Sequence, residues 1–259
     1  MDDVARTAIV TGGGKRVGAG IVGALLADGW RVVAHVHHDG DTVPLGALKV
    51  VADLAAADCA ETIFAAVEAE VGGPVDLLVN NAARFQWDGF GEASAAEFDA
   101  HMAVNARAPM LLIDAFALRH AAAAATGTGA GAGARAGALI VNILDAKLAA
   151  PNPDYLSYTL SKYAAAGLTE LAARALAGQA IRVNAIAPAL MLPSGPQDDA
   201  DHARVHAYNP LRRGVTVDDI IGALRFLIDQ PAITGQTLVI DGGQRFMALP
   251  RDVQFVEPQ

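Results

Sequence analysis

The chain has 259 residues, 53% of them hydrophobic, which is enough to bury the core of one large α/β domain. Its formal net charge of −9 argues against nucleic acid or an anionic membrane as the main partner. The single cysteine, Cys59, excludes an internal disulfide, and because we find neither a signal pattern nor a membrane-length apolar run free of Gly, Pro or charge, we expect a cytoplasmic protein.

Apolar stretches of strand length alternate with amphipathic or alanine-rich stretches of helical length along the chain. The expected strands are residues 7–11, 31–36, 48–51, 75–80, 138–143, 181–186 and 237–240. The expected helices are residues 17–28, 57–71, 95–100, 106–125, 158–176 and 217–229. This alternation predicts one α/β domain over residues 1–259, with a doubly wound, seven-stranded parallel sheet and helices on both faces.

Local signals mark two helix starts and two irregular segments. Ser94 stands three residues before Glu97, and Thr216 three before Asp219, which predicts N-caps for the helices that follow. The Gly/Ala-rich residues 126–137 are expected to form a flexible surface loop. Residues 189–206 follow a strand at the carboxyl edge of the sheet and have two interpretations, a mobile substrate lid or an ordinary surface loop.

Between the first strand and the first helix lies the stretch TGGGKRVGAG, residues 11–20. Its glycines permit a tight turn and a close backbone approach that a Cβ atom would block. The order strand, glycine turn, helix can set a pyrophosphate at the positive N-terminus of the helix. A glycine-rich turn that binds no ligand is the alternative interpretation.

The same stretch resembles the turn T-G-x-x-x-G-x-G of the short-chain dehydrogenase/reductase family. Thr11, Gly12 and Gly18 match, while Arg16 replaces the middle glycine, a variant that resembles the pteridine reductase branch. The resemblance implies a Rossmann fold and a dinucleotide bound at Gly12, Lys15, Arg16 and Val17. The Arg16 guanidinium can supply charge-assisted hydrogen bonds to a phosphate and can also reach a polar substrate.

The residues that follow the second strand bear on the choice between NAD and NADP. An NAD-preferring site usually has an acid there to hold the ribose 2′-hydroxyl, but this strand runs into HVHHDGD. His37 and His38 can donate hydrogen bonds to a 2′-phosphate, which favours NADP. Asp39 is close enough to keep NAD open. A metal site at His35 and His37 is disfavoured because no third ligand is evident, and solvated strand-end histidines remain an alternative.

Two further segments resemble motifs of the family. One motif contacts the adenosine half of the dinucleotide, and the other lies at the sheet edge beside it. Asp53 and Leu54 follow the third strand, where the family's acid contacts the adenine amino group. LLVNNAARF, after the fourth strand, resembles the family's N-N-A-G, with Asn81 and Ala82 in register and Ala83 in place of the glycine. A simple asparagine turn is the alternative.

At the other end of the cofactor, RVNAIAPALML resembles the family's N-x-x-x-P-G, which touches the nicotinamide carboxamide. The resemblance implies contacts from Pro188 and from Leu190, with Ala189 replacing the usual glycine. A backbone carbonyl and N–H can still serve a carboxamide at these positions. The resemblance spans residues 7–243.

The stretch YTLSK places Tyr158 and Lys162 four residues apart, on one face of a helix. The pair resembles the catalytic Tyr and Lys of the family. For Tyr158 to exchange a proton at neutral pH, its pKa must fall by about three units, roughly 4 kcal/mol, and Lys162 with the oxidised nicotinamide is expected to provide that shift. Tyr155 does not fit the pattern, because Thr159 follows it at the lysine position.

The resemblance adds Asn105, which matches the asparagine that binds a proton-relay water, and Asp145, which stands where most members have a serine. Pteridine reductases share that aspartate. A carboxylate cannot donate a hydrogen bond to a carbonyl as serine does, but it can pair with an amino group or pass a proton through Tyr158.

These features suit a pterin, whose ring offers N–H donors and a C=N bond that gains a proton as hydride arrives. Phe85 matches the position that stacks an aromatic ring on the pterin, with a plain core residue as the alternative. Trp87 is a second candidate wall of that pocket. The predicted substrate-binding residues are Arg16, Phe85, Asp145 and Tyr158.

We therefore expect an NADPH-dependent reductase of a C=N or C=O acceptor, best fitted by a dihydropterin. A short-chain reductase of another carbonyl or imine is one alternative, and a catalytically silent dinucleotide-binding regulator is another. A homotetramer is expected by resemblance alone. No metal site is expected.

Overall fold

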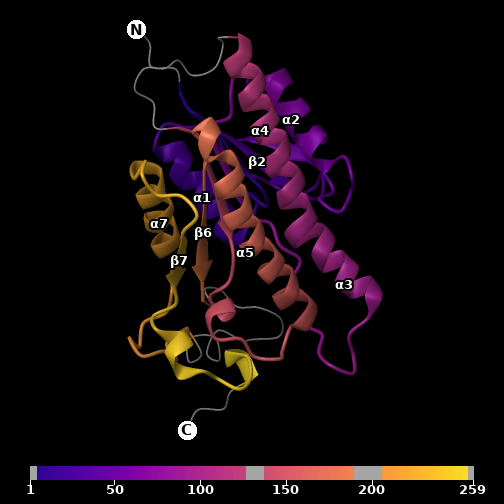
Figure 1. Cartoon of the computed structure of the whole chain (residues 1–259), viewed down its shortest axis with the longest axis vertical. Coiled ribbons are helices and arrows are strands. Elements are labelled where there is room, and N and C mark those ends of the chain that lie inside the picture. Colours follow the sequence, from indigo (N-terminus) through magenta and orange to yellow (C-terminus); the bar gives the residue numbers. More distant parts are fainter. Residues whose placement is uncertain (1–4, 127–136, 190–205, 256–259) are drawn as a thin grey trace.

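The computed structural model describes residues 5–126, 137–189 and 206–255. The predicted seven-stranded parallel sheet is confirmed, in the order β3-β2-β1-β4-β5-β6-β7 (Figure 1). Its strands are β1 (Thr7–Val10), β2 (Arg31–Val36), β3 (Leu48–Val51), β4 (Leu77–Asn80), β5 (Leu139–Ile143), β6 (Arg182–Pro188) and β7 (Thr237–Ile240). Most of the predicted flexible loop and of the possible lid, residues 127–136 and 190–205, lies outside the described residues.

All the expected helices are present. They are α1 (Arg16–Ala27), α2 (Cys59–Glu70), α3 (Ala95–Met102), α4 (Ala108–Thr126), α5 (Leu156–Leu176) and α7 (Val217–Asp229). A π-helical turn, η1 (Ala103–Arg107), joins α3 to α4, and short 3₁₀ turns are η2 (Ala146–Ala149), η3 (Ala177–Gln179), η4 (Gln244–Met247) and η5 (Val253–Phe255). Both predicted N-caps form, at Ser94 and Thr216.

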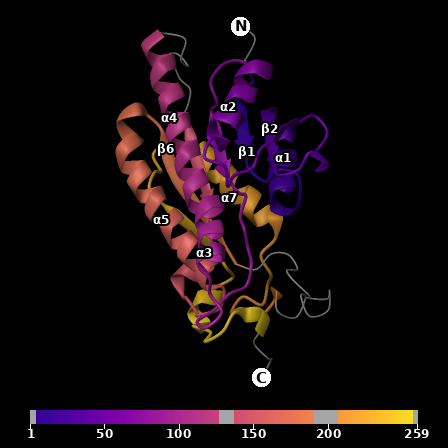
Figure 2. The same cartoon turned by 90° about the vertical axis from the view of Figure 1, so that its right-hand side faces the viewer.

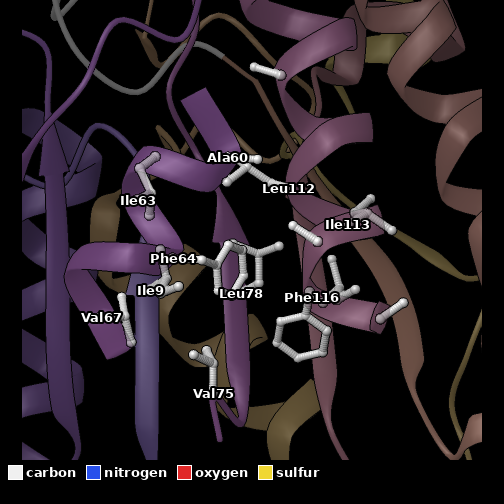
Figure 3. Packing of buried hydrophobic residues seen from close by; sticks show 14 of the residues in the cluster. Ile9, Ala60, Ile63, Phe64, Val67, Val75, Leu78, Leu112, Ile113 and Phe116 are labelled. Carbon is white, nitrogen blue, oxygen red and sulfur yellow. The ribbon is translucent and has the colours of Figure 1, made fainter. Parts of the chain in front are cut away.

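Two helix layers cover the sheet. The helices α1 and α7 pack on one face, and α2, α4 and α5 pack on the other (Figure 2). Alternate strand residues divide between the layers, so that Ile9 and Leu78 meet Phe64 of α2 and Phe116 of α4 (Figure 3). The strands read as nearly continuous apolar runs because both of their faces are buried.

The helical run Ala95–Ala125 is long and apolar enough to cross a membrane by length and composition alone, at 31 residues and a mean hydropathy of 1.2. Its inner side belongs to the core of the domain, where Leu112 and Phe116 are fully buried beneath α2 and against the sheet. The run thus packs one side against α2 and the sheet, and 39% of its apolar window is buried.

The strand order reverses direction between β1 and β4, which are neighbours in the sheet. Chains leaving the carboxyl ends of β1 and β4 diverge, which opens the crevice where sheets of this kind bind ligands. The glycine turn after β1 and the NNAA segment after β4 flank that position, as the sequence predicts.

Candidate active site

The turn between β1 and α1 has the backbone geometry of a phosphate cradle. Gly12 has a φ of +64°, and a Cβ atom on Gly18 would overlap the carbonyl oxygen of Gly12. Arg16, in place of the family's middle glycine, has a φ of +53°. This left-handed region disfavours residues with a Cβ, which is the physical reason for a glycine there. The first amides of α1 follow this turn directly, and the N-terminus of a helix is a favourable place for an anion.

His35 supports the turn from below. Its buried ring accepts the Gly12 N–H at Nδ1 (3.2 Å), and Nε2 lies 3.0 Å from the carbonyl oxygen of Ala52. Burial lowers the pKa of His35, and the neutral tautomer with its proton on Nε2 satisfies both bonds. The two ring nitrogens of His35 thus link the glycine turn to the end of β3. These two hydrogen bonds explain the buried position of His35 without a metal ion.

An acid that the sequence analysis did not single out lies in the region predicted to hold the adenosine half of the cofactor. The Asp41 carboxylate accepts the N–H of His38 at 3.0 Å. That bond, with the nearby charges of Lys15, His38 and His37, holds the pKa of Asp41 below its ordinary value. Lys15, His37 and His38 therefore gather around one carboxylate beside the turn. The signal in the sequence was the D-G-D turn after the histidines.

The two other acids of this region have different partners. Asp39, which kept the NAD alternative open, pairs with Lys49 at 3.3 Å. Asp53 accepts the N–H of Ala55 at 2.8 Å and lies 3.9 Å from the Nδ1 atom of His37, at the same edge of the site. Leu54 is buried in the core, so only its backbone can serve a ligand.

The NNAA segment is bonded to the glycine turn. Asn81 Nδ2 donates to the carbonyl oxygens of Thr11 (2.9 Å) and Gly12 (3.3 Å). The N–H groups of Asn81 and Ala82 both donate to Thr11 Oγ1 at 3.0 Å. Ala83 follows as an exposed residue. The network excludes a simple surface turn, because it holds the carboxyl ends of β1 and β4 in fixed relation.

The structure describes only part of the segment that is predicted to contact the nicotinamide. Pro188 ends β6 beside Ile240 of β7. The N–H of Ala189 donates to the carbonyl oxygen of Ile240 at 2.9 Å, and Ala189 borders a cavity. Leu190 lies outside the described residues.

Tyr158 and Asp145 are hydrogen-bonded to each other at the carboxyl edge of the sheet. The phenol of Tyr158, on α5, donates to Asp145 Oδ2 at 2.8 Å, and Asp145 Oδ1 accepts the N–H of Lys147 at 2.8 Å. Burial raises the pKa of Asp145, so this carboxyl holds a proton more readily than an exposed one. The two groups can share or exchange one proton.

The expected fall in the pKa of Tyr158 is wrong for the protein chain by itself. Burial, followed by the charge and the hydrogen bond of Asp145, holds this pKa well above its ordinary value of 10. Asp145 was expected to orient substrate or share a proton, but it also opposes ionisation of the phenol because its negative charge repels the phenolate.

Lys162 is buried one helical turn from Tyr158. Its Nζ atom donates to the carbonyl oxygen of Ile143 at 2.7 Å and lies 5.7 Å from the centre of the Tyr158 ring. Burial lowers the pKa of Lys162 to about 8, against the opposing attraction of Asp145. The lysine therefore titrates close to physiological pH.

Asn105 lies in the π-helical turn η1 and is buried. Its Oδ1 atom accepts the N–H of Arg84 at 2.7 Å, and Nδ2 donates to the Arg84 carbonyl oxygen and to Ser161 Oγ, both at 2.9 Å. Asn105 thus joins the loop after β4 to α5. Local π-helical turns are frequent at functional sites because they redirect one side chain or carbonyl.

Phe85 lies beside Tyr158. Its ring stands edge-on to Tyr158 (4.7 Å, 86°) and stacks on Tyr155 (4.2 Å, 17°). At 38% exposure it is not a plain core residue. Phe85, Asp145 and Tyr158 border a cavity of about 110 Å³, whose other lining residues are Ala146, Lys147, Ala150, Asn152, Ala189, Gln244, Arg245, Leu249, Arg251, Asp252 and Val253.

Two predicted contributors do not line this cavity within the described part of the chain. Trp87 is 43% exposed and lies beside Gly89, away from the residues that line this cavity, so its role as a pocket wall stays a prediction. Arg16 is also not among the lining residues. Its contact with a phosphate at the glycine turn stays a prediction.

The cavity contains residues that the motifs could not reveal. Lys147 follows Asp145, and Tyr155, which the Y-x-x-x-K pattern excluded as a catalyst, supports Phe85 from a left-handed backbone with a φ of +56°. Four C-terminal residues, Leu249, Arg251, Asp252 and Val253, also line the cavity. They lie about a hundred positions from Tyr158 in the sequence, and no local pattern reports such a contact.

Comparisons with known proteins agree with this geometry. The family model described as enoyl-(acyl carrier protein) reductase matches residues 14–245. Pteridine reductase 1 of Leishmania tarentolae and L-xylulose reductase of Bos taurus are each 33% identical, over 92% of this chain and 96% of those proteins. FolM alternative dihydrofolate reductase 1 from Brucella canis, solved with NADP, is 32% identical at a TM-score of 0.79, over 93% of this chain and 94% of that one. The chain belongs to the short-chain dehydrogenase/reductase family of oxidoreductases.

Proposed function

We propose that this protein is an NADPH-dependent reductase whose acceptor is a dihydropterin or a related reduced pteridine. The observation that carries the proposal is the 2.8 Å bond from the Tyr158 hydroxyl to Asp145, which puts a carboxyl where a ketone reductase of the family usually has serine. Support comes from the similarity to pteridine reductase 1 and to FolM structures solved with NADP.

The described residues fit a dinucleotide phosphate. A side chain at Gly18 would close the cradle against Gly12, and Lys15, His37 and His38 gather beside it around Asp41. Lys15, His37 and His38 can donate to a 2′-phosphate, which favours NADP over NAD, while the Asp41 carboxylate beside them opposes the added negative charge. The bound nicotinamide supplies the hydride.

The protein's own residues handle the proton. Tyr158 donates a proton to the acceptor nitrogen, and the Lys162 ammonium stabilises the phenolate that results. Asp145 accepts the hydrogen bond of the Tyr158 hydroxyl, and burial raises the pKa of the Asp145 carboxyl, which helps it to exchange a proton with Tyr158. Asn105 fixes the loop that carries Phe85. Its part in a proton relay through a water stays a prediction of the family resemblance.

A carbonyl acceptor is the second candidate. L-xylulose reductases of several mammals and a carbonyl reductase from Sus scrofa are 31–33% identical to this chain, as similar as pteridine reductase 1. The Asp145 carboxylate disfavours this candidate because it cannot donate to a carbonyl oxygen. The silent regulator is disfavoured by the assembled Tyr158, Asp145 and Lys162.

The proposal includes a cytoplasmic homotetramer. Leu160, Tyr163 and Leu171 of α5 are exposed (44%, 41% and 68%), and their spacing places them along one side of the helix. An apolar helix face of this kind fits a self-complementary contact between copies of the chain.

The test measures NADPH consumption with dihydrobiopterin and with a diketone for the wild type, Tyr158→Phe and Asp145→Ser. The Tyr158→Phe variant should lose about 10²–10⁴-fold in kcat, the usual contribution of a general acid, with NADPH affinity unchanged. The Asp145→Ser variant should lose about tenfold more activity on the pterin than on the diketone, a difference of 1.4 kcal/mol. Wild-type activity on the diketone alone would establish the carbonyl candidate instead.

A further inference from the structure

The C-terminal segment 251–255 lies across the opening of the active site. Figure 1 shows this segment at the same end of the molecule as the lower ends of α5 and β6. Leu249, Arg251, Asp252 and Val253 line the cavity that holds Tyr158 and Asp145. No motif of the sequence accounts for these residues.

An ion pair between Arg251 and Asp154, here called the Arg251–Asp154 clasp, holds the segment. Arg251 Nε donates to both oxygens of Asp154, at 3.0 and 2.8 Å, and the Asp252 N–H donates to Asp154 Oδ2 at 2.7 Å. The Asp154 side chain is 7% exposed and stands four residues before Tyr158. Although burial opposes it, these bonds hold the pKa of Asp154 below its ordinary value, so the clasp is ionised.

A second ion pair lies deeper in the cavity wall. Lys147 Nζ is 3.5 Å from Asp252 Oδ2 and donates to the carbonyl oxygen of Asp154. The backbone N–H of the same lysine holds Asp145. The segment is thus bonded on both sides of the stretch between Asp145 and Tyr158.

The segment also supports the aromatic platform. Phe255 lies over Tyr155, with ring centres 6.3 Å apart and nearly parallel planes (15°). Tyr155 in turn stacks on Phe85, the ring that faces the acceptor. Displacement of Phe255 would remove one of the two aromatic rings that stack on Tyr155.

We propose that segment 251–255 is a substrate-recognition element, held by the Arg251–Asp154 clasp and by Phe255, that forms the outer wall of the acceptor pocket. The inference rests on the proposed function. Its ligand is a flat heterocycle with an amide-type edge: the aromatic platform takes the ring face, while the Lys147–Asp252 pair offers one donor and one acceptor to the edge. Arg251 and Phe255 are positioning residues in this scheme, since they act through Asp154 and Tyr155.

The test uses the full-length chain with Arg251→Ala, Arg251→Lys and Phe255→Leu. Arg251→Ala and Phe255→Leu should raise the KM for dihydrobiopterin about tenfold, equivalent to 1.4 kcal/mol, while kcat and NADPH affinity change less than about threefold. Arg251→Lys, which keeps a cation for Asp154, should recover part of the lost affinity. The matched control is Arg225→Ala, which removes a similar two-bond pair with Asp28 on the far side of the fold.

A binding measurement separates this inference from the proposed function. In the complex with NADP⁺ and dihydrobiopterin, which does not turn over, hydrogen exchange at the backbone amides of residues 252 and 253 should slow in the wild type and not in Arg251→Ala. If dihydrobiopterin binds with this protection but is not reduced, the function is overturned and the segment's role stands. A KM for Arg251→Ala equal to that of the wild type, or unchanged exchange on binding, would overturn the segment's role.

Discussion

Lys162 shows at the scale of one residue how catalysis and stability oppose each other. The fall of its pKa from 10.5 to about 8 corresponds to on the order of 3 kcal/mol against the charged form in the folded state. The burial of Lys162 destabilises the fold, but it also places the ammonium beside Tyr158, where it can stabilise a phenolate. Sequence spacing predicted the pair, but the size and sign of the pKa shifts depend on burial that spacing does not report.

The Lys162→Met variant should therefore lose activity and gain stability. The folded state binds the Lys162 proton less tightly than the unfolded state, so the wild type is penalised most below pH 8, and the penalty fades as the pH rises toward 10.5. Urea unfolding should show the variant's gain at pH 7 and little gain near pH 10. For the wild type, kcat/KM should fall above about pH 8 as the ammonium is lost. A stability gain that does not depend on pH would contradict this account.

Arg16 carries a side chain at a backbone position whose conformation favours glycine. A left-handed φ of +53° costs a residue with a Cβ about 1 kcal/mol relative to glycine. Arg16→Gly should thus be about 1 kcal/mol more stable than Arg16→Ala in urea unfolding. Both variants should bind NADPH less tightly than the wild type, as measured by fluorescence titration, because both lack the guanidinium. Equal NADPH affinity in all three proteins would remove Arg16 from the phosphate site.

At the scale of the element, short sequence signals determine where a helix begins, whereas hydrogen bonds between residues far apart in the sequence fix the conformation of the loops. The Thr216–Asp219 pair forms a complete capping box, with the Thr216 hydroxyl accepting the Asp219 N–H (3.3 Å) and the Asp219 carboxylate accepting the Thr216 N–H (2.9 Å). Both partners lie within one turn, so the sequence alone was sufficient. The loop after β4 differs, because Asn105 and Glu97 hold Arg84 from a distant helical run.

Thr216→Ala should lower the free energy of unfolding by about 1 kcal/mol, since α7 loses its cap. For a domain of this size that is a fall in Tm of roughly 2–4 °C, measurable by calorimetry. The matched control is Thr62→Ala, an exposed threonine inside α2, which should be neutral or slightly stabilising. The Michaelis constants of both variants should equal those of the wild type.

At the scale of the whole molecule, one sheet carries both halves of the proposed function. The cofactor cradle follows β1, and the catalytic pair follows β5 and opens α5, so the order β1-β4-β5 places them beside each other. The exposed apolar face of α5 lies outside this arrangement and remains for the proposed contact between copies.

Leu171→Glu should therefore shift the protein to a smaller assembly in light scattering, because a carboxylate at an apolar contact costs desolvation. Leu45→Glu, at a fully exposed leucine far from α5 in the sequence, is the control and should keep the wild-type mass. A monomeric wild type, or an unchanged mass for Leu171→Glu, would exclude association through this face.

The sequence by itself determined the strand and helix pattern, the glycine turn, the helix caps and the pairing of Tyr158 with Lys162, because each depends on residues within a few positions of one another. Only the tertiary structure decided the rest. His35 supports the turn, Asp41 lies beside His38, burial and Asp145 raise the pKa of Tyr158, and residues 251–253 line the cavity. These outcomes depend on burial and on contacts between distant residues, which exist only once the sheet has brought its carboxyl edge together.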